Sequence, residues 1–145
     1  KEVMKLLGLD IGEKRIGMAT SDELGMFAHG HPFLSRKGSD ESVCADIKRF
    51  VEENRVTRII AGIPLNLDGS CGIAAEKIRT FLARLRQTVG VPVEEWDERL
   101  STKEAMRYMQ DSSLSGSKKR KKVDSLAAQI FLQNFLDHHK SQGAL

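Results

Sequence analysis

Cysteine is scarce in this chain, and its placement excludes a common kind of metal site. Cys44 and Cys71 are the two cysteines among 145 residues, and they lie too far apart in sequence to form a zinc-type ligand pair. Such low usage fits a reducing compartment. We therefore expect both thiols to be incidental and the protein to be cytoplasmic.

Long hydrophobic runs are also missing. The apolar stretches fall far short of the roughly 18 residues that a membrane-spanning helix needs, and the first residues lack the pattern of a secretory signal. We expect no membrane partner. Hydrophobic residues make up 40% of the chain, enough for one core, and this length is typical of one domain. We therefore expect a single domain over residues 1–145.

Histidine offers little to a transition-metal hydrolase. His29 and His31 belong to a predicted strand, His138 and His139 lie near the end of the chain, and no H-E-x-x-H pattern is present. We expect all four to be surface residues. The net charge of +3 and the pI of about 9.0 are compatible with binding to nucleic acid.

The segment from Leu6 to Asp22, LLGLDIGEKRIGMATSD, organises the rest of the sequence. An apolar run stops at Asp10, a charged turn follows Gly12, and a second strand-like run begins at about Arg15. Side chains alternate along a strand, so Gly8 and Asp10 share one face of the first strand. A carboxylate there is costly unless a cation pairs with it. Asp10 is therefore either a metal ligand or a residue that caps the turn.

The remaining pattern predicts an α/β domain with a mixed sheet: an antiparallel meander, then right-handed βαβ crossovers. Pro32 suggests that the third strand lies at an edge. Ser39 and the acids after it supply helix-start chemistry for the first helix. The second helix is expected to bury a stripe that begins with Ala74 and Ile78, and to end at Gly90. The expected strands are 3–10, 15–21, 26–35, 56–63 and 91–96, and the expected helices are 39–54, about 74–89, about 101–109 and 123–138.

Further acidic residues lie at the ends of elements. Asp97 and Glu98 end the last strand, and ligands gather at the carboxyl ends of strands in α/β sheets. Asp124 opens the final helix, on one face with Ala127 and Ala128, whose small side chains would let the helix approach the sheet. A carboxylate on an apolar face usually pairs or coordinates, although the helix dipole also favours an acid there.

Carboxylates that converge on one pocket repel each other, and hard divalent cations relieve the repulsion. Oxygen ligands suit Mg²⁺ or Mn²⁺. Two such ions are a standard device for phosphodiester hydrolysis.

Cationic and polar residues close to these acids could hold phosphates. The basic run before Asp124 is either a mobile, solvated loop over about 111–122 or a segment that orders on a polyanion. The candidate nucleic-acid-binding residues are Lys14, Arg15, Asn66, Arg99, Lys118, Lys119, Arg120, Lys121 and Lys122.

Four blocks in order, LGLDIGEKRIGMATSD, GIPLNLDGS, DERLST and KKVDSLAAQIFLQNFL, resemble the YqgF/RuvX family of bacterial proteins. That family comprises Holliday-junction-resolvase-like proteins and nucleases assigned to pre-16S ribosomal RNA. The resemblance implies a ribonuclease-H-like fold, with a five-stranded mixed sheet ordered 3-2-1-4-5 and flanked by helices. It also implies a divalent-metal nuclease site made of Asp10, Glu98 and Asp124, with Asp97 close enough to compete with Glu98.

Several functions remain open at this point. The first is a metal-dependent nuclease that processes the 5′ end of pre-16S rRNA, with ribosomal precursor particles as partners. The second is a resolvase for branched DNA, which predicts a homodimer rather than a monomer because two symmetric cuts need two sites. A non-catalytic RNA-binding module would not need three acids at element ends. An actin-type ATPase would need two lobes, and this length holds one.

Overall fold

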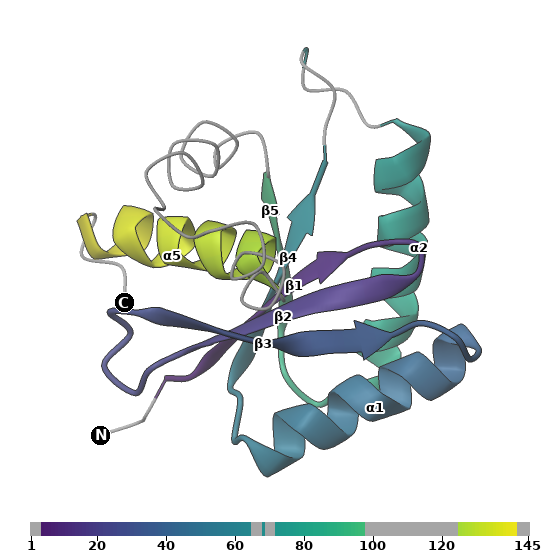
Figure 1. Cartoon of the computed structure of the whole chain (residues 1–145), viewed down its shortest axis with the longest axis horizontal. Coiled ribbons are helices and arrows are strands. Elements are labelled where there is room, and N and C mark those ends of the chain that lie inside the picture. Colours follow the sequence, from purple (N-terminus) through teal and green to yellow (C-terminus); the bar gives the residue numbers. More distant parts are fainter. Residues whose placement is uncertain (1–3, 65–67, 69–71, 98–124, 142–145) are drawn as a thin grey trace, which may run out of the picture.

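The computed structural model describes residues 4–64, 68, 72–97 and 125–141. It contains a five-stranded sheet in the order β3-β2-β1-β4-β5, with helices on both faces (Figure 1). The expected strand order and mixed sheet are confirmed. The strands are β1 (Leu6–Ile11), β2 (Arg15–Ser21), β3 (Ala28–Ser35), β4 (Arg58–Ile63) and β5 (Val93–Asp97).

The first three strands form the expected antiparallel meander, and β4 and β5 run parallel to β1. The edge position expected for the third strand is confirmed. The register between β2 and β3 shifts between Ile16 and Met18. Pro32 lies on the β3 side of this bulge, where a residue without an N–H group does not interrupt the ladder.

The described helices divide the core between the two faces of the sheet (Figure 1). Helices α1 (Asp40–Glu53) and α2 (Ile73–Thr88) enclose the larger core, which contains Leu7, Leu9 and Ile11 of β1. Helix α5 (Leu126–Ser141) packs on the opposite face, in a core that contains Leu6. The alternation expected in β1 is therefore confirmed. Each residue of β1 can be assigned to the α1–α2 face or to the α5 face.

The amino terminus of α1 follows the capping chemistry read from its sequence. Ser39 precedes the helix in an extended conformation, and its hydroxyl accepts a hydrogen bond of 3.1 Å from the backbone N–H of Ser42. Asp40 and Glu41 in the first turn complement the helix dipole. Within the part of the chain that the structure describes, no helix has the length and hydrophobicity of a membrane span.

Several strand boundaries differ from the prediction. Val56 does not open β4, because its N–H donates to the carbonyl of Val51 at the end of α1. Strand β5 begins at Val93 because Pro92 has no N–H for the ladder. Met26 and Phe27 lie before β3, in a turn where Asp22 accepts the N–H of Met26 at 2.8 Å. Strand β1 begins at Leu6 rather than at residue 3.

The predicted inward faces of two helices are partly wrong. In α2, Ala75 is buried and Ala74 is exposed. In α5, Ala128 is buried and Ala127 is exposed, because Leu132 and Leu136 are also buried and rotate the helix toward them. Larger apolar side chains gain more from burial than alanine does, and they set which face turns inward.

The ends of these helices also differ from the prediction. Helix α5 begins at Leu126 rather than at residue 123. Helix α2 ends at Thr88, where Val89 is already extended and 6% exposed. The helix thus ends one residue before Gly90, and Gly90 does not supply a left-handed cap.

Candidate active site

Asp10 lies near the carboxyl end of β1, on the face covered by α5. It pairs with Gly17 of β2 and is half-buried. Gly8, two residues earlier on the same face, lies so close to α5 that an added Cβ would be 3.1 Å from Leu132 Cβ. The Asp10 side chain is therefore directed to the α5 side of the sheet, near the start of that helix.

Gly17 leaves a gap between Asp10 and the amino end of α5. A Cβ added at Gly17 would lie 3.4 Å from Asp10 Cβ, 3.4 Å from Ser125 Cα and 3.5 Å from Ala128 Cβ. A side chain larger than a methyl group would push these atoms apart. The absence of a side chain at residue 17 thus allows the start of α5 to approach the strand that carries Asp10.

Ser125 fixes the start of α5 against the sheet. Its hydroxyl accepts a hydrogen bond of 2.7 Å from the backbone N–H of Met18, which lies at the β2–β3 bulge. The residue is 1% exposed and adopts a φ of 59°, which is uncommon for a non-glycine residue. Farther along α5, the Gln133 side chain accepts the N–H of Ala28 and donates to the carbonyl of Met26, both at 2.9 Å. These contacts tie α5 to β2 and to the β3 edge.

The turn after β1 carries two of the predicted phosphate-binding cations. Lys14 and Arg15 are both exposed, and the Arg15 guanidinium lies 4.3 Å from the centre of the Phe33 ring. The N–H of Gly12 donates to the carbonyl of Arg15 at 3.0 Å, and a Cβ at residue 12 would come within 2.8 Å of that oxygen. Glycine is therefore required for close approach, and the turn presents its cations next to the carboxyl end of β1, near Asp10.

Asp97 lies on the other face of the sheet from Asp10. It ends β5 and pairs with Ile63, whose side chain belongs to the α1–α2 core. Glu95, two residues earlier, is bound by Arg79 of α2 at 3.0 Å. Trp96, between them, packs against Phe135 of α5, with ring centres 5.2 Å apart. Alternation along β5 therefore assigns Asp97 to the α1–α2 face.

Most of the remaining candidates lie outside the described residues. These are Glu98, Asp124, Asn66, Arg99 and the basic run Lys118, Lys119, Arg120, Lys121 and Lys122, and the expected helix at about 101–109 lies there too. Among residues 4–64, 68, 72–97 and 125–141, no three histidine, cysteine or acidic residues form a group that could hold a metal ion. Of the predicted metal ligands, the described part contains Asp10 and Asp97.

Two of the four histidines differ from the surface role expected for them. His31 is partly buried: its Nε2 lies 2.7 Å from the Thr20 hydroxyl, and its ring meets Phe50 edge-on. Burial, together with Lys5 and His29, lowers the pKa of His31. His139 is stacked on Phe135, with ring centres 3.9 Å apart. These two rings are therefore packing residues, while His29 and His138 are exposed.

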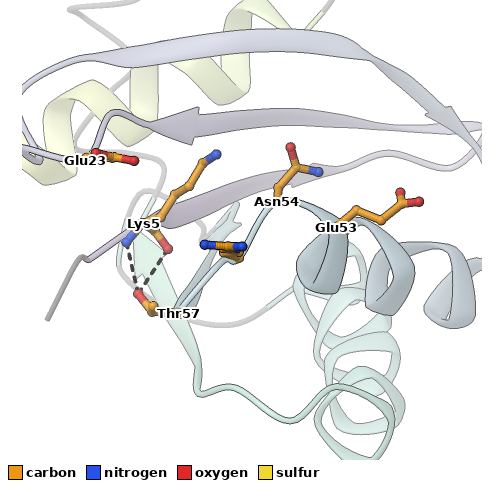
Figure 2. Close-up of a pocket in the computed structure, with 6 residues that line it drawn as sticks. Lys5, Glu23, Glu53, Asn54 and Thr57 are labelled. Carbon is orange, nitrogen blue, oxygen red and sulfur yellow. Dashed lines mark hydrogen bonds between the residues drawn. The ribbon is translucent and has the colours of Figure 1, made fainter.

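A surface pocket of about 490 Å³ lies at the other end of β1 (Figure 2). Its lining carries both signs of charge, including Lys5 and Glu53. Thr57 exchanges two hydrogen bonds of 3.1 Å with the backbone of Lys5. Because Lys5 precedes β1 and Asp10 lies near its carboxyl end, this pocket is separate from the candidate site.

Three residues that support the site were not found by sequence reasoning. Ser125 had a weak signal, since serine is a common residue before a helix. Gly17 and Arg36 had none, because their importance comes from segments that are distant in sequence. Arg36 donates to the carbonyl of Gly12 at 2.7 Å.

Comparisons with known proteins identify the family of this chain. The family model described as "RuvX: Holliday junction resolvase" matches residues 4–138. The chain belongs to the RuvX family. Similar RuvX relatives include two proteins named "Putative pre-16S rRNA nuclease". The one from Halothermothrix orenii is 43% identical over 135 residues, covering 93% of this chain and 96% of the relative. The one from Myxococcus xanthus is 43% identical over 137 residues, covering 94% and 90%.

Solved structures support the fold of this RuvX family member. Thermus thermophilus RuvC, in a structure described as a complex with a Holliday junction substrate, matches with a TM-score of 0.57 and 17% identity, over 97% of each chain. A second structure of T. thermophilus RuvC has the same TM-score at 14% identity, over 97% of this chain and 98% of that chain. The predicted ribonuclease-H-like fold is confirmed by this likeness and by the strand order.

Proposed function

We propose that this chain is a metal-dependent nuclease that hydrolyses phosphodiester bonds at the 5′ end of pre-16S rRNA in the cytoplasm. The observation that carries the proposal is the position of Asp10, a half-buried carboxylate near the carboxyl end of β1 and opposite Ser125 across the gap at Gly17. Membership of the RuvX family and the names of the relatives supply the reaction and the substrate.

Asp124 and Glu98 complete the proposed metal site with Asp10. Asp124 directly precedes Ser125, so its Cα is covalently held about 3.8 Å from that of Ser125, and Ser125 Cα borders the gap next to Asp10. Glu98 directly follows Asp97, which ends β5 and faces α1 and α2. Because neighbouring side chains of an extended chain point to opposite sides, we propose Glu98 as the acid of this pair for the α5 side. This argument favours Glu98 over Asp97 as the ligand.

The donor set fits Mg²⁺ or Mn²⁺, because carboxylate oxygens are the ligands that both ions prefer. Such ions supply an activated water and stabilise the leaving oxygen. The chain itself holds Asp10 in a paired strand and presents Lys14 and Arg15 on the adjacent turn, where both can contact substrate phosphates. The further residues that we propose to contact the nucleic acid are Asn66, Arg99 and the basic run at 118–122.

The second candidate is cleavage of four-way DNA junctions, with a homodimer as the active species. The description of the matching family favours it, as does the fold that the chain shares with a RuvC bound to a Holliday junction. We expect wild-type protein to cut a pre-16S fragment with its 5′ precursor extension faster than a synthetic junction, with Mg²⁺ or Mn²⁺ required. Gel assays with each ion or with chelator measure this.

Three results would change the proposal. Preferential, symmetric cutting of junctions would favour the resolvase. Binding of RNA without any cutting would favour a non-catalytic RNA-binding module. Cutting that survives chelator would exclude metal dependence.

The neighbouring acids Asp97 and Glu98 offer a matched test of the face assignment. We expect Glu98→Gln to lower kcat by about 10²–10³-fold, since a lost ligand removes several kcal/mol of transition-state stabilisation. Asp97→Asn should stay within about threefold of wild type, because residue 97 faces α1 and α2. Single-turnover cleavage of the same RNA measures both. The opposite ranking of the two variants would make Asp97 the ligand.

A further inference from the structure

The turn that presents Lys14 and Arg15 has an anchor of its own, Arg36. This arginine directly follows β3, and its side chain is mostly buried, with 20% of its surface exposed. Its Nη1 group donates to the carbonyl of Gly12 at 2.7 Å, and its backbone N–H donates to the carbonyl of Lys14 at 3.0 Å. One residue therefore holds the turn from two points.

The same guanidinium is held in place from the other side. Its Nη2 group lies 3.2 Å from a carboxylate oxygen of Asp40, in the first turn of α1. Its central carbon lies 5.0 Å from the centre of the Phe81 ring, in α2. A planar guanidinium can satisfy two acceptors at fixed angles while stacking on a ring, and a lysine ammonium does not reproduce this geometry. Arg36 thus connects the turn to both helices of the α1–α2 face.

Asp10 does not depend on this anchor to the same extent. It lies within β1, which is paired with β2 on one side and β4 on the other. In the turn, by contrast, residues 12–14 lie between the strands, and Arg15 is the first residue of β2. Loss of the anchor should therefore displace Lys14 and Arg15 more than Asp10. Cationic side chains that contact phosphates act on substrate binding and register.

We infer that Arg36 is a positioning residue for substrate binding, which acts by holding the Gly12–Arg15 turn against α1 and α2. The inference rests on the proposed nuclease function for its substrate, and it concerns the side of the sheet opposite to the proposed metal site. Arg36 orders the turn so that Lys14 and Arg15 meet the phosphate backbone in one geometry.

The test compares Arg36→Met and Arg36→Lys with Arg49→Met. Arg49 also makes an ion pair of 3.2 Å, with Asp46 within α1, but its side chain is 64% exposed. With the pre-16S fragment and Mg²⁺, we expect Arg36→Met to raise KM about tenfold and to change kcat less than threefold, because misplaced binding groups weaken binding without removing the reacting groups. Arg36→Lys should behave like Arg36→Met, and Arg49→Met like wild type.

A second measurement does not depend on activity. Amide hydrogen exchange at Gly12, whose N–H closes the turn, should become at least about tenfold faster in Arg36→Met, while exchange at Leu9 within β1 stays unchanged. This readout also covers the case in which Arg36→Met lowers overall stability, since global unfolding would accelerate both amides.

Each outcome separates the inference from the function on which it rests. Unchanged exchange at Gly12 overturns the anchoring role, whatever the cleavage result. Full rescue of KM by Arg36→Lys overturns positioning and makes Arg36 a direct phosphate contact. Wild-type cleavage that does not depend on Asp10 overturns the proposed function, and the exchange data then still decide whether Arg36 orders the turn.

Discussion

Asp10→Asn is expected to lower cleavage of the pre-16S fragment by about 10³-fold or more while the protein stays folded. The substitution keeps the shape of the side chain and removes the charge that would hold a divalent cation, and several kcal/mol of transition-state stabilisation are lost with it. Asp10 is half-buried near the end of a strand, so a neutral amide is tolerated there more easily than an unpaired carboxylate. Single-turnover kinetics and a thermal melt measure the two effects.

The matched control for this variant is Asp46→Asn. Asp46 lies in α1, is paired with Arg49 at the surface and belongs to the other face of the sheet. It should cleave like wild type. Equal activity in Asp10→Asn and wild type would show that the metal site lies elsewhere, and a collapsed melting transition in Asp10→Asn would make Asp10 a structural residue.

Two substitutions of increasing size at Gly17 test whether the start of α5 must lie close to Asp10. Gly17→Ala should keep activity within about threefold, because its Cβ finds ordinary contact distances of 3.4–3.5 Å. Gly17→Val places two further methyl groups on this Cβ. The space around it is bordered by Asp10 Cβ, Ser125 Cα and Ala128 Cβ. Overpacking of this kind costs about 1–3 kcal/mol. Because it moves the start of α5 away from Asp10, we expect cleavage to fall by about 10²-fold.

Gly90→Val controls for the added bulk. A Cβ at residue 90 would have nothing within 4 Å, and the residue is exposed, so both stability and cleavage should stay close to wild type. Denaturant titration and cleavage rates report the two effects at Gly17. Wild-type activity in a folded Gly17→Val protein would contradict the idea that the start of α5 must lie against Asp10.

The sheet could be anticipated because its signals are local. Alternation assigned Gly8 and Asp10 to one face of β1, and the structure confirms that both lie on the α5 side. Pro32 correctly indicated an edge strand. The inward faces of the helices were predicted less accurately. Ala74 and Ala127 fit the predicted buried stripes in the sequence but are exposed in the structure. A helix with small residues on one face can turn a different face inward, because nearby leucines gain more free energy from burial than alanines do.

The site was anticipated only in part. Asp10 stood out because a carboxylate ends an apolar run, whereas nothing in the sequence distinguished the faces of Asp97 and Glu98 until β5 was paired with β4. The supporting residues were missed for the same reason. Ser125 bonds to Met18 across 107 positions of sequence, and Arg36 reaches Gly12 across 24.

The amino-acid sequence by itself determined the strands, most helix starts, the place of Asp10 near the end of β1 and, through its motifs, the family. These properties depend on neighbours within one or two turns of chain, where side-chain period and capping chemistry act directly. The tertiary structure alone decided that Gly17 admits the start of α5, that Arg36 holds the turn after β1, and that Asp97 faces away from Asp10. Those features depend on which distant segments pack together, and packing depends on the fit of whole faces rather than on any local pattern.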